Sequence, residues 1–272
     1  MDIGIFTRTF QRENISKVLG AISKCGYRAA HLSFESAGLE SLPIKISDKK
    51  IGEIKGAQDS FKVYLTSASG TFNMAHPDAK VREEGLHRLN VIAEACSKLS
   101  IPLISLCSGT LNPKDKWAPH PDNGSKEAWS VMLKTMQKAV KISEKHKVSI
   151  GIEPELTNVV SSPKKAYKLI SELRSERVKV ILDPANLFEI ASKEEARSII
   201  LSALDLLDSN IAMVHAKDRN SAGDFVLPGG GVVPFEWLIN ELHTRKLNVP
   251  VVAHGFEESK AKSVLIYLKS CL

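Results

Sequence analysis

The sequence predicts an α/β fold, a (β/α)8 TIM barrel that forms one domain over residues 1–272. Short apolar segments alternate eight times with segments of helical periodicity, and successive strand ends lie roughly thirty to forty residues apart, the length of a βα unit. A length of 272 residues with 43% hydrophobic residues suits a single barrel with a large core. A doubly wound open sheet would place a glycine-rich turn after its first strand, but Thr7-Arg8-Thr9 stands there.

Four strands and four helices are predicted in the first half of the chain. The helical segments repeat apolar residues at i, i+3, i+4 and i+7, as in the segment from Ile15 to Ile22, which Gly26 ends. The expected strands are Ile3–Phe6, Tyr27–Phe34, Phe61–Ala68 and Ile101–Cys107. The next helices are expected over Ser47–Gln58, around Leu86–Cys96 and over Ser125–His146.

The stretch Val148–Glu155, with the sequence VSIGIEPE, is the clearest strand of the second half. Four of its first five residues are β-branched or glycine, which suits a strand buried on both faces, and Pro154 ends it directly after Glu153. The other expected strands are Val178–Leu182, Ile211–Val214 and Val251–Ala253. One helix is expected to begin at Ser162, as N-cap, with Pro163 in its first turn. Further helices are expected over Glu194–Leu207, Pro234–His243 and Glu258–Leu272.

Side chains that can bind a metal follow the ends of consecutive predicted strands. Glu153 ends the fifth strand, and Asp183, His215 and His254 follow the sixth, seventh and eighth. These ends meet at one mouth of a (β/α)8 barrel, where active sites are built. Singly, each residue has a structural explanation, such as a turn cap or a buried histidine, but together they would repel one another or hold a cation. The set suits one divalent metal ion, Mn²⁺ or Zn²⁺ before Mg²⁺, Fe²⁺ or Co²⁺.

Four segments carry a resemblance to a known family. They are GIEPE at 151–155, ILDPANL at 181–187, VHAKD at 214–218 and LPGGGVVP at 227–234. On these motifs the chain resembles the xylose-isomerase-like TIM barrel superfamily of sugar phosphate isomerases and epimerases along nearly its whole length. GTLNPKDKWAPHPDN at 109–123 resembles the signature of one bacterial branch. The motifs are specific for the superfamily and say little about the substrate.

The resemblance implies a divalent metal ion held by Glu153, Asp183 and His215, and a carbonyl sugar or polyol that chelates it. Glu153 would then move a proton, through a metal-stabilised enediolate. In the epimerases of this family a second glutamate at the end of strand eight is both ligand and opposite-face base, and His254 stands in its place here. Epimerisation by two glutamates is therefore in doubt, whereas one-base isomerisation, histidine-assisted proton transfer and dehydration stay open.

Candidate substrate contacts lie in the segments that follow the strands. They are Arg8, His76, Trp117, His120 and Lys217. An indole can pack on a sugar ring, an imidazole can bind a hydroxyl, and the cations can bind a phosphate. For the two loop residues Trp117 and His120, an ordinary surface position explains the sequence equally well. Gly229–Gly231 is either a flexible turn or a run of amides that approaches a phosphate.

Composition favours a cytoplasmic protein that binds small molecules. The net charge of +6 comes from lysines scattered along helices, which is typical of solvated surfaces and does not favour a nucleic-acid partner. No targeting sequence or long apolar segment is found, so no membrane association is expected. Four widely spaced cysteines favour reduced thiols over disulfides. The expected partner is a sugar or sugar phosphate, and a homo-oligomer stays open.

The predicted function is a metal-dependent sugar or sugar phosphate isomerase or epimerase, with three alternatives. A dehydratase or lyase would act on a similar polyol. An apurinic-site endonuclease would need further ligands, but Asn186 stands where a histidine would be required and no Asp-x-His follows His215 before Gly231. A non-catalytic ligand-binding barrel is the third alternative, which His254 leaves open.

Overall fold

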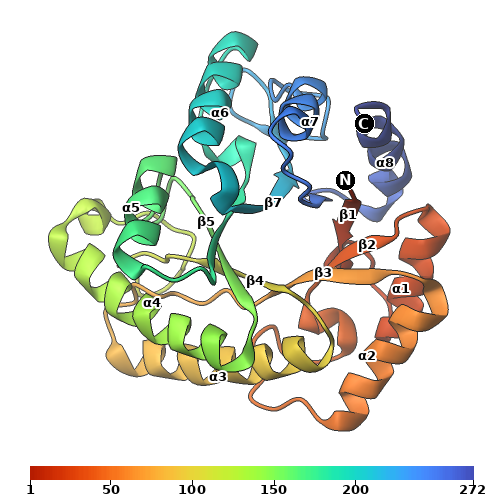
Figure 1. The fold of residues 1–272 in the computed structure, drawn as a ribbon, viewed down its shortest axis with the longest axis horizontal. Helices are drawn as coiled ribbons and strands as arrows, with labels where there is room; N and C mark the ends of the chain where they lie inside the picture. Colours follow the sequence, from red (N-terminus) through yellow and green to blue (C-terminus); the bar gives the residue numbers. More distant parts are fainter.

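A computed structural model describes residues 1–272, and its centre is a closed barrel of eight parallel strands (Figure 1). The barrel strands are β1 (Ile3–Phe6), β2 (Ala29–Leu32), β3 (Tyr64–Ser69), β4 (Leu103–Cys107), β5 (Ser149–Glu153), β6 (Val178–Leu182), β7 (Ile211–Ala216) and β10 (Val251–Ala253). Their order around the barrel is β1-β10-β7-β6-β5-β4-β3-β2. The predicted (β/α)8 fold is confirmed, and all eight strands end at the same mouth.

Helices follow the barrel strands and form the outer ring in Figure 1. They are α1 (Ile15–Cys25), α2 (Asp48–Phe61), α3 (Ala79–Lys98), α4 (Lys126–His146), α5 (Pro163–Leu173), α6 (Lys193–Leu207), α7 (Phe235–Thr244) and α8 (Ala261–Ser270). Local capping fixes several of their ends. The Ser162 side chain accepts a hydrogen bond from the Lys165 amide at the start of α5, and Gly26 ends α1 with φ 103°.

Several predicted elements have different bounds in the structure, and two strands and the last helix illustrate the differences. The strand predicted over 27–34 is confined to β2, and the strand predicted over 61–68 begins only at Tyr64. Phe61 belongs instead to α2, because its ring fills the space beside Gly20 of α1, where a Cβ atom would lie 3.1 Å from it. The helix predicted over 258–272 is divided into a 3-10 turn, Glu258–Lys260, and α8.

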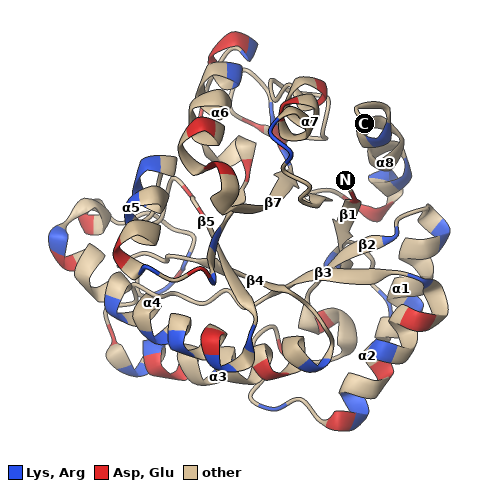
Figure 2. Cartoon of the chain, viewed as in Figure 1, with Lys and Arg blue, Asp and Glu red and all other residues tan.

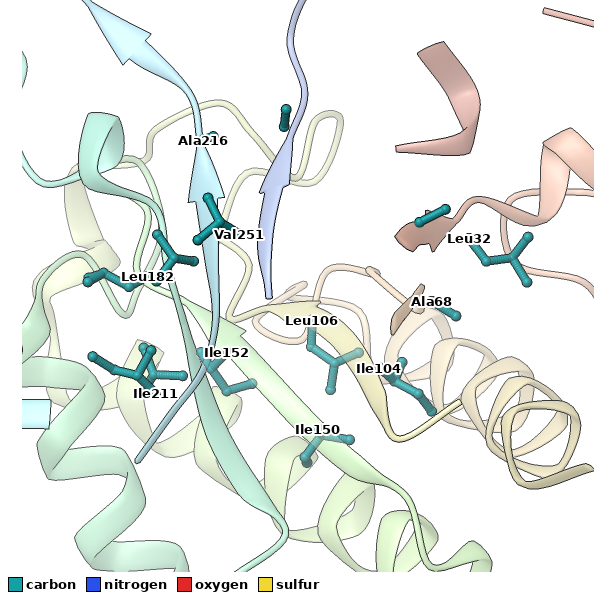
Figure 3. Close-up of a cluster of buried hydrophobic side chains, with 14 of the residues drawn as sticks. Leu32, Ala68, Ile104, Leu106, Ile150, Ile152, Leu182, Ile211, Ala216 and Val251 are labelled. Atoms are coloured by element: carbon teal, nitrogen blue, oxygen red, sulfur yellow. The ribbon is translucent and has the colours of Figure 1, made fainter. Parts of the chain in front are cut away.

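The apolar core has two parts. The larger part lies between the barrel and the helices and includes outward-facing strand residues such as Ile104, Ile150 and Leu182 (Figure 3). The smaller part fills the inside of the barrel with Phe6, Leu103, Ile181, Met213 and Val252. Gly151 makes room for this inner layer, since a Cβ atom there would lie 2.8 Å from the side chain of Ile181.

Charged side chains are mixed on the outer helices. Basic and acidic residues are interspersed over the helices seen in Figure 2, and several pair with each other, for example Lys98 with Asp48 at 2.9 Å. Such exposed pairs contribute little to stability. No helix of the structure is both long and apolar enough to span a membrane.

Candidate active site

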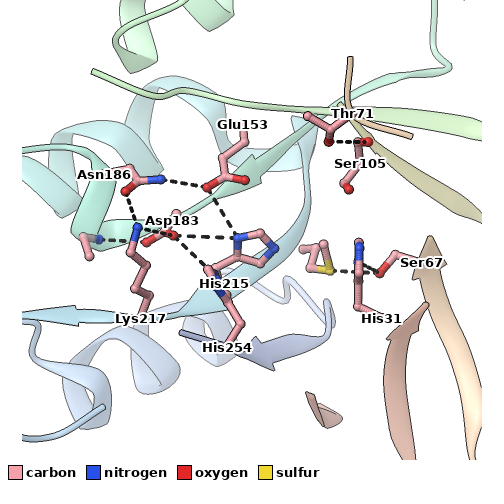
Figure 4. A network of polar contacts seen from close by, with 12 residues as sticks. His31, Ser67, Thr71, Ser105, Glu153, Asp183, Asn186, His215, Lys217 and His254 are labelled. Carbon is pink, nitrogen blue, oxygen red and sulfur yellow. Dashed lines mark hydrogen bonds and ion pairs between the residues drawn. The ribbon is translucent and has the colours of Figure 1, made fainter. Parts of the chain in front are cut away.

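Four predicted ligand residues meet at the carboxyl-terminal mouth of the barrel (Figure 4). Glu153 is the last residue of β5, and Asp183 follows β6 as the N-cap of a short 3-10 helix, Pro184–Asn186. His215 lies within β7 rather than after it, because the strand continues to Ala216. His254 follows β10. The barrel thus brings residues from four strands into one group, as the sequence predicts.

Asp183, His215 and His254 form the tightest part of this group. One ligand atom of each lies within 4.8 Å of the others. The Oδ2 atom of Asp183 is 3.7 Å from His215 Nδ1 and 3.5 Å from His254 Nε2. All three atoms are buried and have no hydrogen-bond partner, whereas Asp183 Oδ1 accepts a hydrogen bond from the Ala185 amide. We call these three residues the ligand cluster.

Glu153 adjoins the ligand cluster through its Oε1 atom. That atom lies 3.5 Å from His215 Nδ1 and accepts a hydrogen bond of 2.8 Å from Asn186 Nδ2. The amide oxygen of Asn186 accepts a hydrogen bond of 2.8 Å from Lys217 Nζ, which is also 3.9 Å from Asp183 Oδ2. The connection through Asn186 was not expected, since the sequence singled this residue out only as a missing histidine.

The charges of the ligand cluster compensate one another. Burial opposes ionisation of Asp183, but His215, His254 and Lys217 together lower its pKa below the usual range. Burial would lower the pKa of His215, but the carboxylates of Glu153 and Asp183 outweigh it and raise this pKa to about 9. Burial and the charge of His215 lower the pKa of His254. In the metal-free protein, His215 therefore carries the proton that a metal ion would replace.

The ligand cluster fits a divalent metal ion. Buried polar atoms are normally hydrogen-bonded, so three unpaired ligand atoms aimed at one point indicate a missing partner. A carboxylate and two imidazoles suit Zn²⁺, Mn²⁺ or Fe²⁺, and Glu153 offers a further oxygen. Asp183, His215 and His254 are therefore the residues that could hold such an ion.

Phe6 and His31 form an aromatic wall beside the ligand cluster. The Phe6 ring stacks on His31 at 4.0 Å and lies 5.4 Å from the His215 ring and 4.7 Å from the His254 ring. His31 Nδ1 contacts Ser67 Oγ at 2.8 Å. Burial, followed by nearby cationic groups, lowers the pKa of His31 well below its ordinary value, so this imidazole is neutral. Beyond the apolar pattern of β1, nothing in the sequence indicates this wall.

A polar cavity of about 640 Å³ opens from the ligand cluster. Among the predicted substrate contacts, Arg8, Trp117 and Lys217 line it, together with Glu153, His215 and His254. Its rim carries two aromatic side chains, Trp117 and Phe225, which are 47% and 53% exposed. The volume and the few convergent polar groups are typical of a site for a small polar molecule.

Phe225 reaches the cavity on a hairpin that the sequence did not predict. The hairpin pairs β8 (Asp218–Arg219) with β9 (Phe225–Val226) in antiparallel register. Lys217 Nζ lies 3.8 Å and Arg219 Cζ 4.1 Å from the centre of the Phe225 ring, which are cation–π distances. Strands of two residues are too short to produce a recognisable pattern in a sequence.

Two predicted substrate contacts lie away from the cavity. His76 Nε2 donates to the Pro113 carbonyl at 3.1 Å, and its Nδ1 accepts from the Asp78 amide, so the ring joins two loops. His120 caps the 3-10 turn Pro121–Gly124, with Nδ1 accepting from the Asp122 amide. The local backbone occupies a nitrogen of each ring, and neither residue lines the cavity. Both histidines, predicted as substrate contacts, thus lie outside the cavity, and their role in substrate binding stays a prediction.

The glycine loop, residues 227–234, is held by a side chain of the protein itself. The carboxylate of Asp218, fully buried, accepts hydrogen bonds from the amides of Arg219, Gly229, Gly231 and Val233, at 2.8 to 3.0 Å. The backbone must approach closely here, since a Cβ atom at Gly231 would lie 2.1 Å from the Arg219 carbonyl oxygen. The amides of Gly229 and Gly231 are therefore occupied by the carboxylate of Asp218, and the Gly230 amide donates to the Leu227 carbonyl at 2.8 Å.

Comparison with known proteins agrees with this geometry. A family model described as a xylose isomerase-like TIM barrel matches residues 19–271. No curated protein matches this chain in sequence.

Solved structures with the same fold include two epimerases and a probable dehydratase. An apo 3-keto-D-glucoside 4-epimerase from E. coli has a TM-score of 0.78 at 18% identity, with 100% of both chains covered. A D-psicose 3-epimerase with D-tagatose from Clostridium cellulolyticum H10 has a TM-score of 0.76 at 16% identity, covering 100% of this chain and 99% of the other. A probable 3-DHS dehydratase from Bacillus anthracis has a TM-score of 0.78 at 13% identity, with 99% of both chains covered. At these identities the likeness shows a shared fold.

Proposed function

Because the chain belongs to the xylose isomerase-like TIM barrel family, we propose that it is a divalent-metal-dependent isomerase or epimerase of a small sugar, sugar phosphate or polyol. The observation that carries this proposal is the ligand cluster, in which three buried and unpaired ligand atoms converge beside the Glu153 carboxylate. The names of the structural neighbours, two sugar epimerases and one probable dehydratase, support the same class of chemistry.

In this proposal Asp183, His215 and His254 hold the metal ion, and Glu153 contributes a further oxygen. Mn²⁺ and Zn²⁺ are the favoured ions, because both accept mixed carboxylate and imidazole ligands and leave positions open for substrate. When bound, such an ion makes the carbon–hydrogen bond beside a substrate carbonyl more acidic. His215 gives up its proton when the site is loaded.

Glu153 is the proposed group that removes and returns the substrate proton. It lines the cavity, and its Oε2 atom has no hydrogen-bond partner within the protein, so one oxygen is free to meet a substrate. Trp117 and Phe225 offer apolar faces at the rim for a sugar ring, while Arg8 and Lys217 offer positive charge for a hydroxyl or phosphate oxygen. Together they orient a polar substrate with its reacting carbon toward Glu153.

The role of His254 decides between an isomerase and an epimerase. Its Nε2 atom faces Asp183 at 3.5 Å, which supports a ligand role for this nitrogen. A ligand nitrogen cannot also accept a proton, so Glu153 would then be the single base. One base is enough to shift a proton between neighbouring carbons or to start an elimination, whereas inversion of one carbon by two bases requires a free His254. A dehydratase is therefore the second candidate.

Deuterium incorporation from solvent tests the proposal. Protein reconstituted with Mn²⁺ or Zn²⁺ is incubated in D₂O with a panel of ketoses, ketose phosphates and keto-polyols, and products are analysed by mass spectrometry and NMR. We expect metal-dependent incorporation with at least one substrate, lost in Glu153→Gln. Incorporation with isomerised product indicates an isomerase, inversion at one carbon an epimerase, and loss of water a dehydratase. Absence of exchange with every substrate, or metal-dependent nicking of abasic DNA, would contradict the proposal.

A further inference from the structure

The side chains of Lys217, Asn186 and Glu153 form a chain of hydrogen bonds with a fixed direction (Figure 4). An ammonium group only donates, so Lys217 Nζ must face the amide oxygen of Asn186. This contact turns the amide nitrogen toward Glu153, which then has to accept at Oε1. Both hydrogen bonds measure 2.8 Å, and Asn186 is only 3% exposed. The direction of the whole chain is therefore set by its lysine.

Local backbone geometry brings these side chains together. Asp183 is the N-cap of the 3-10 helix Pro184–Asn186, and its carbonyl oxygen accepts a hydrogen bond of 3.1 Å from the Asn186 backbone amide. Asn186 therefore stands beside Asp183 at the same mouth. Lys217 directly follows β7, two residues after His215, and both side chains approach Asp183 Oδ2, at 3.9 and 3.7 Å. Asp183 and His215 thus each have one of these two residues two or three positions further along the chain.

We propose that Asn186 and Lys217 are positioning residues that hold the Glu153 carboxylate with Oε1 against the ligand cluster and Oε2 toward the substrate. The inference rests on the proposed function and assigns a different role to each oxygen of the Glu153 carboxylate. Oε1 is fixed by Asn186 beside His215 Nδ1, at 3.5 Å, and Oε2 is left without a protein partner. The hydrogen bond from Asn186 is the one that the protein gives this carboxylate, and the contact of Oε1 with His215 Nδ1 is longer.

Metal-free crystal structures test the positioning role without relying on activity. In Asn186→Leu, which keeps a similar volume but cannot hydrogen-bond, we expect the Glu153 carboxylate to turn from its present orientation, because the hydrogen bond that orients it is lost while either of its oxygens can contact His215 Nδ1. We expect the same change in Lys217→Met, because the buried amide oxygen of Asn186 loses its donor and the side chain moves. Lys179→Met is the control, since Lys179 lies at the opposite mouth of the barrel. An unmoved Glu153 in Asn186→Leu would overturn the inference.

Metal affinity gives the second readout. Competition with a chromogenic chelator should show a loss of about 10- to 100-fold for Zn²⁺ in Asn186→Leu, as for other residues that orient a ligand. Because Lys217 acts through Asn186, the double variant should lose no more than Asn186→Leu alone. Losses that multiply in the double variant would show that the two residues act separately and would contradict the inference. If the unaltered protein binds no metal, the proposed function fails, and the metal-free structures still decide the positioning role.

Discussion

The Nε2 atom of His254 lies 3.5 Å from the Oδ2 atom of Asp183, although β7 separates their strands β10 and β6 in the barrel. His215 lies between the two strands, and its ring packs edge to face against the His254 ring, with the ring centroids 4.5 Å apart. Burial of His254 Nε2 and Asp183 Oδ2 without hydrogen bonds is costly, so the arrangement indicates a further partner for these two atoms. His254 thus belongs with the proposed metal ligands.

Replacement of His254 should therefore weaken metal binding. We expect His254→Ala to lower Zn²⁺ affinity by more than about 100-fold, because loss of a ligand costs more than loss of an orienting partner. Chelator competition measures the affinity. His120→Ala serves as the control, since that ring caps a turn outside the cavity. Unchanged affinity in His254→Ala would assign this histidine to proton transfer alone.

Stability of the metal-free protein should fall as the pH rises from about 6.5 to about 9. The pKa of His215 is raised from its usual value to about 9 by Glu153 and Asp183, which outweigh burial. The folded state therefore binds this proton more tightly than the unfolded state, and the resulting stability is present below pH 6.5 and lost through pH 9.

Thermal unfolding in the presence of a chelator measures this effect. We expect the Tm of the chelated protein to decrease across this pH range and that of His215→Gln to decrease less. Metal affinity should change in the opposite direction, rising toward pH 9, because protons compete for His215. Parallel pH curves for the two proteins would show that His215 has an ordinary pKa.

Asp218 should be essential for the stability of the glycine loop. Asp218→Asn replaces a carboxylate oxygen that accepts amide hydrogen bonds with a group that cannot accept them, at a fully buried position. We expect a loss of about 2 to 4 kcal/mol in the free energy of unfolding, measured with urea. Asp224→Asn on the same hairpin is exposed and should change it by less than about 0.5 kcal/mol. Equal effects would contradict the assigned role.

Substrate binding should depend on Trp117 and not on the two histidines outside the cavity. With a substrate identified by deuterium incorporation, Trp117→Ala should raise KM about 10-fold, the equivalent of one aromatic contact. His76→Ala and His120→Ala should leave KM and kcat within about twofold, because both rings hold loops together through the backbone. A large KM effect at His120 would show that the loop before α4 moves into the site.

The sequence predicts the fold and the meeting of the four candidate ligands at one mouth, because both follow from the regular alternation of strands and helices. The bounds of β1 and β6 match the predicted strands, and each strand end is marked by a polar residue such as Asp183. Where strands meet long helices, prediction is less accurate, as at Phe61, because packing against Gly20 and not local propensity decides the boundary.

Contacts between side chains from distant segments could not be predicted. Asn186 shows no pattern of its own, and its hydrogen bonds to Glu153 and Lys217 exist only once three strand ends converge. Asp218 within the VHAKD motif showed no sign that it would occupy the amides of the glycine loop. The position of His76 in the loop after the third strand suggests a substrate contact, but in the structure its ring hydrogen-bonds to the Pro113 carbonyl. Such partners depend on the three-dimensional arrangement and not on spacing.

An anomalous diffraction map of crystals soaked in Mn²⁺ tests the central claim most directly. We predict one strong peak at the carboxyl-terminal mouth of the barrel, at about 2.0 to 2.3 Å from Asp183 Oδ2, His215 Nδ1 and His254 Nε2. The peak should be absent from crystals of Asp183→Ala grown and soaked in the same way. A map without a peak at these three atoms, or a peak that persists in Asp183→Ala, would contradict the metal centre and the enzyme proposed from it.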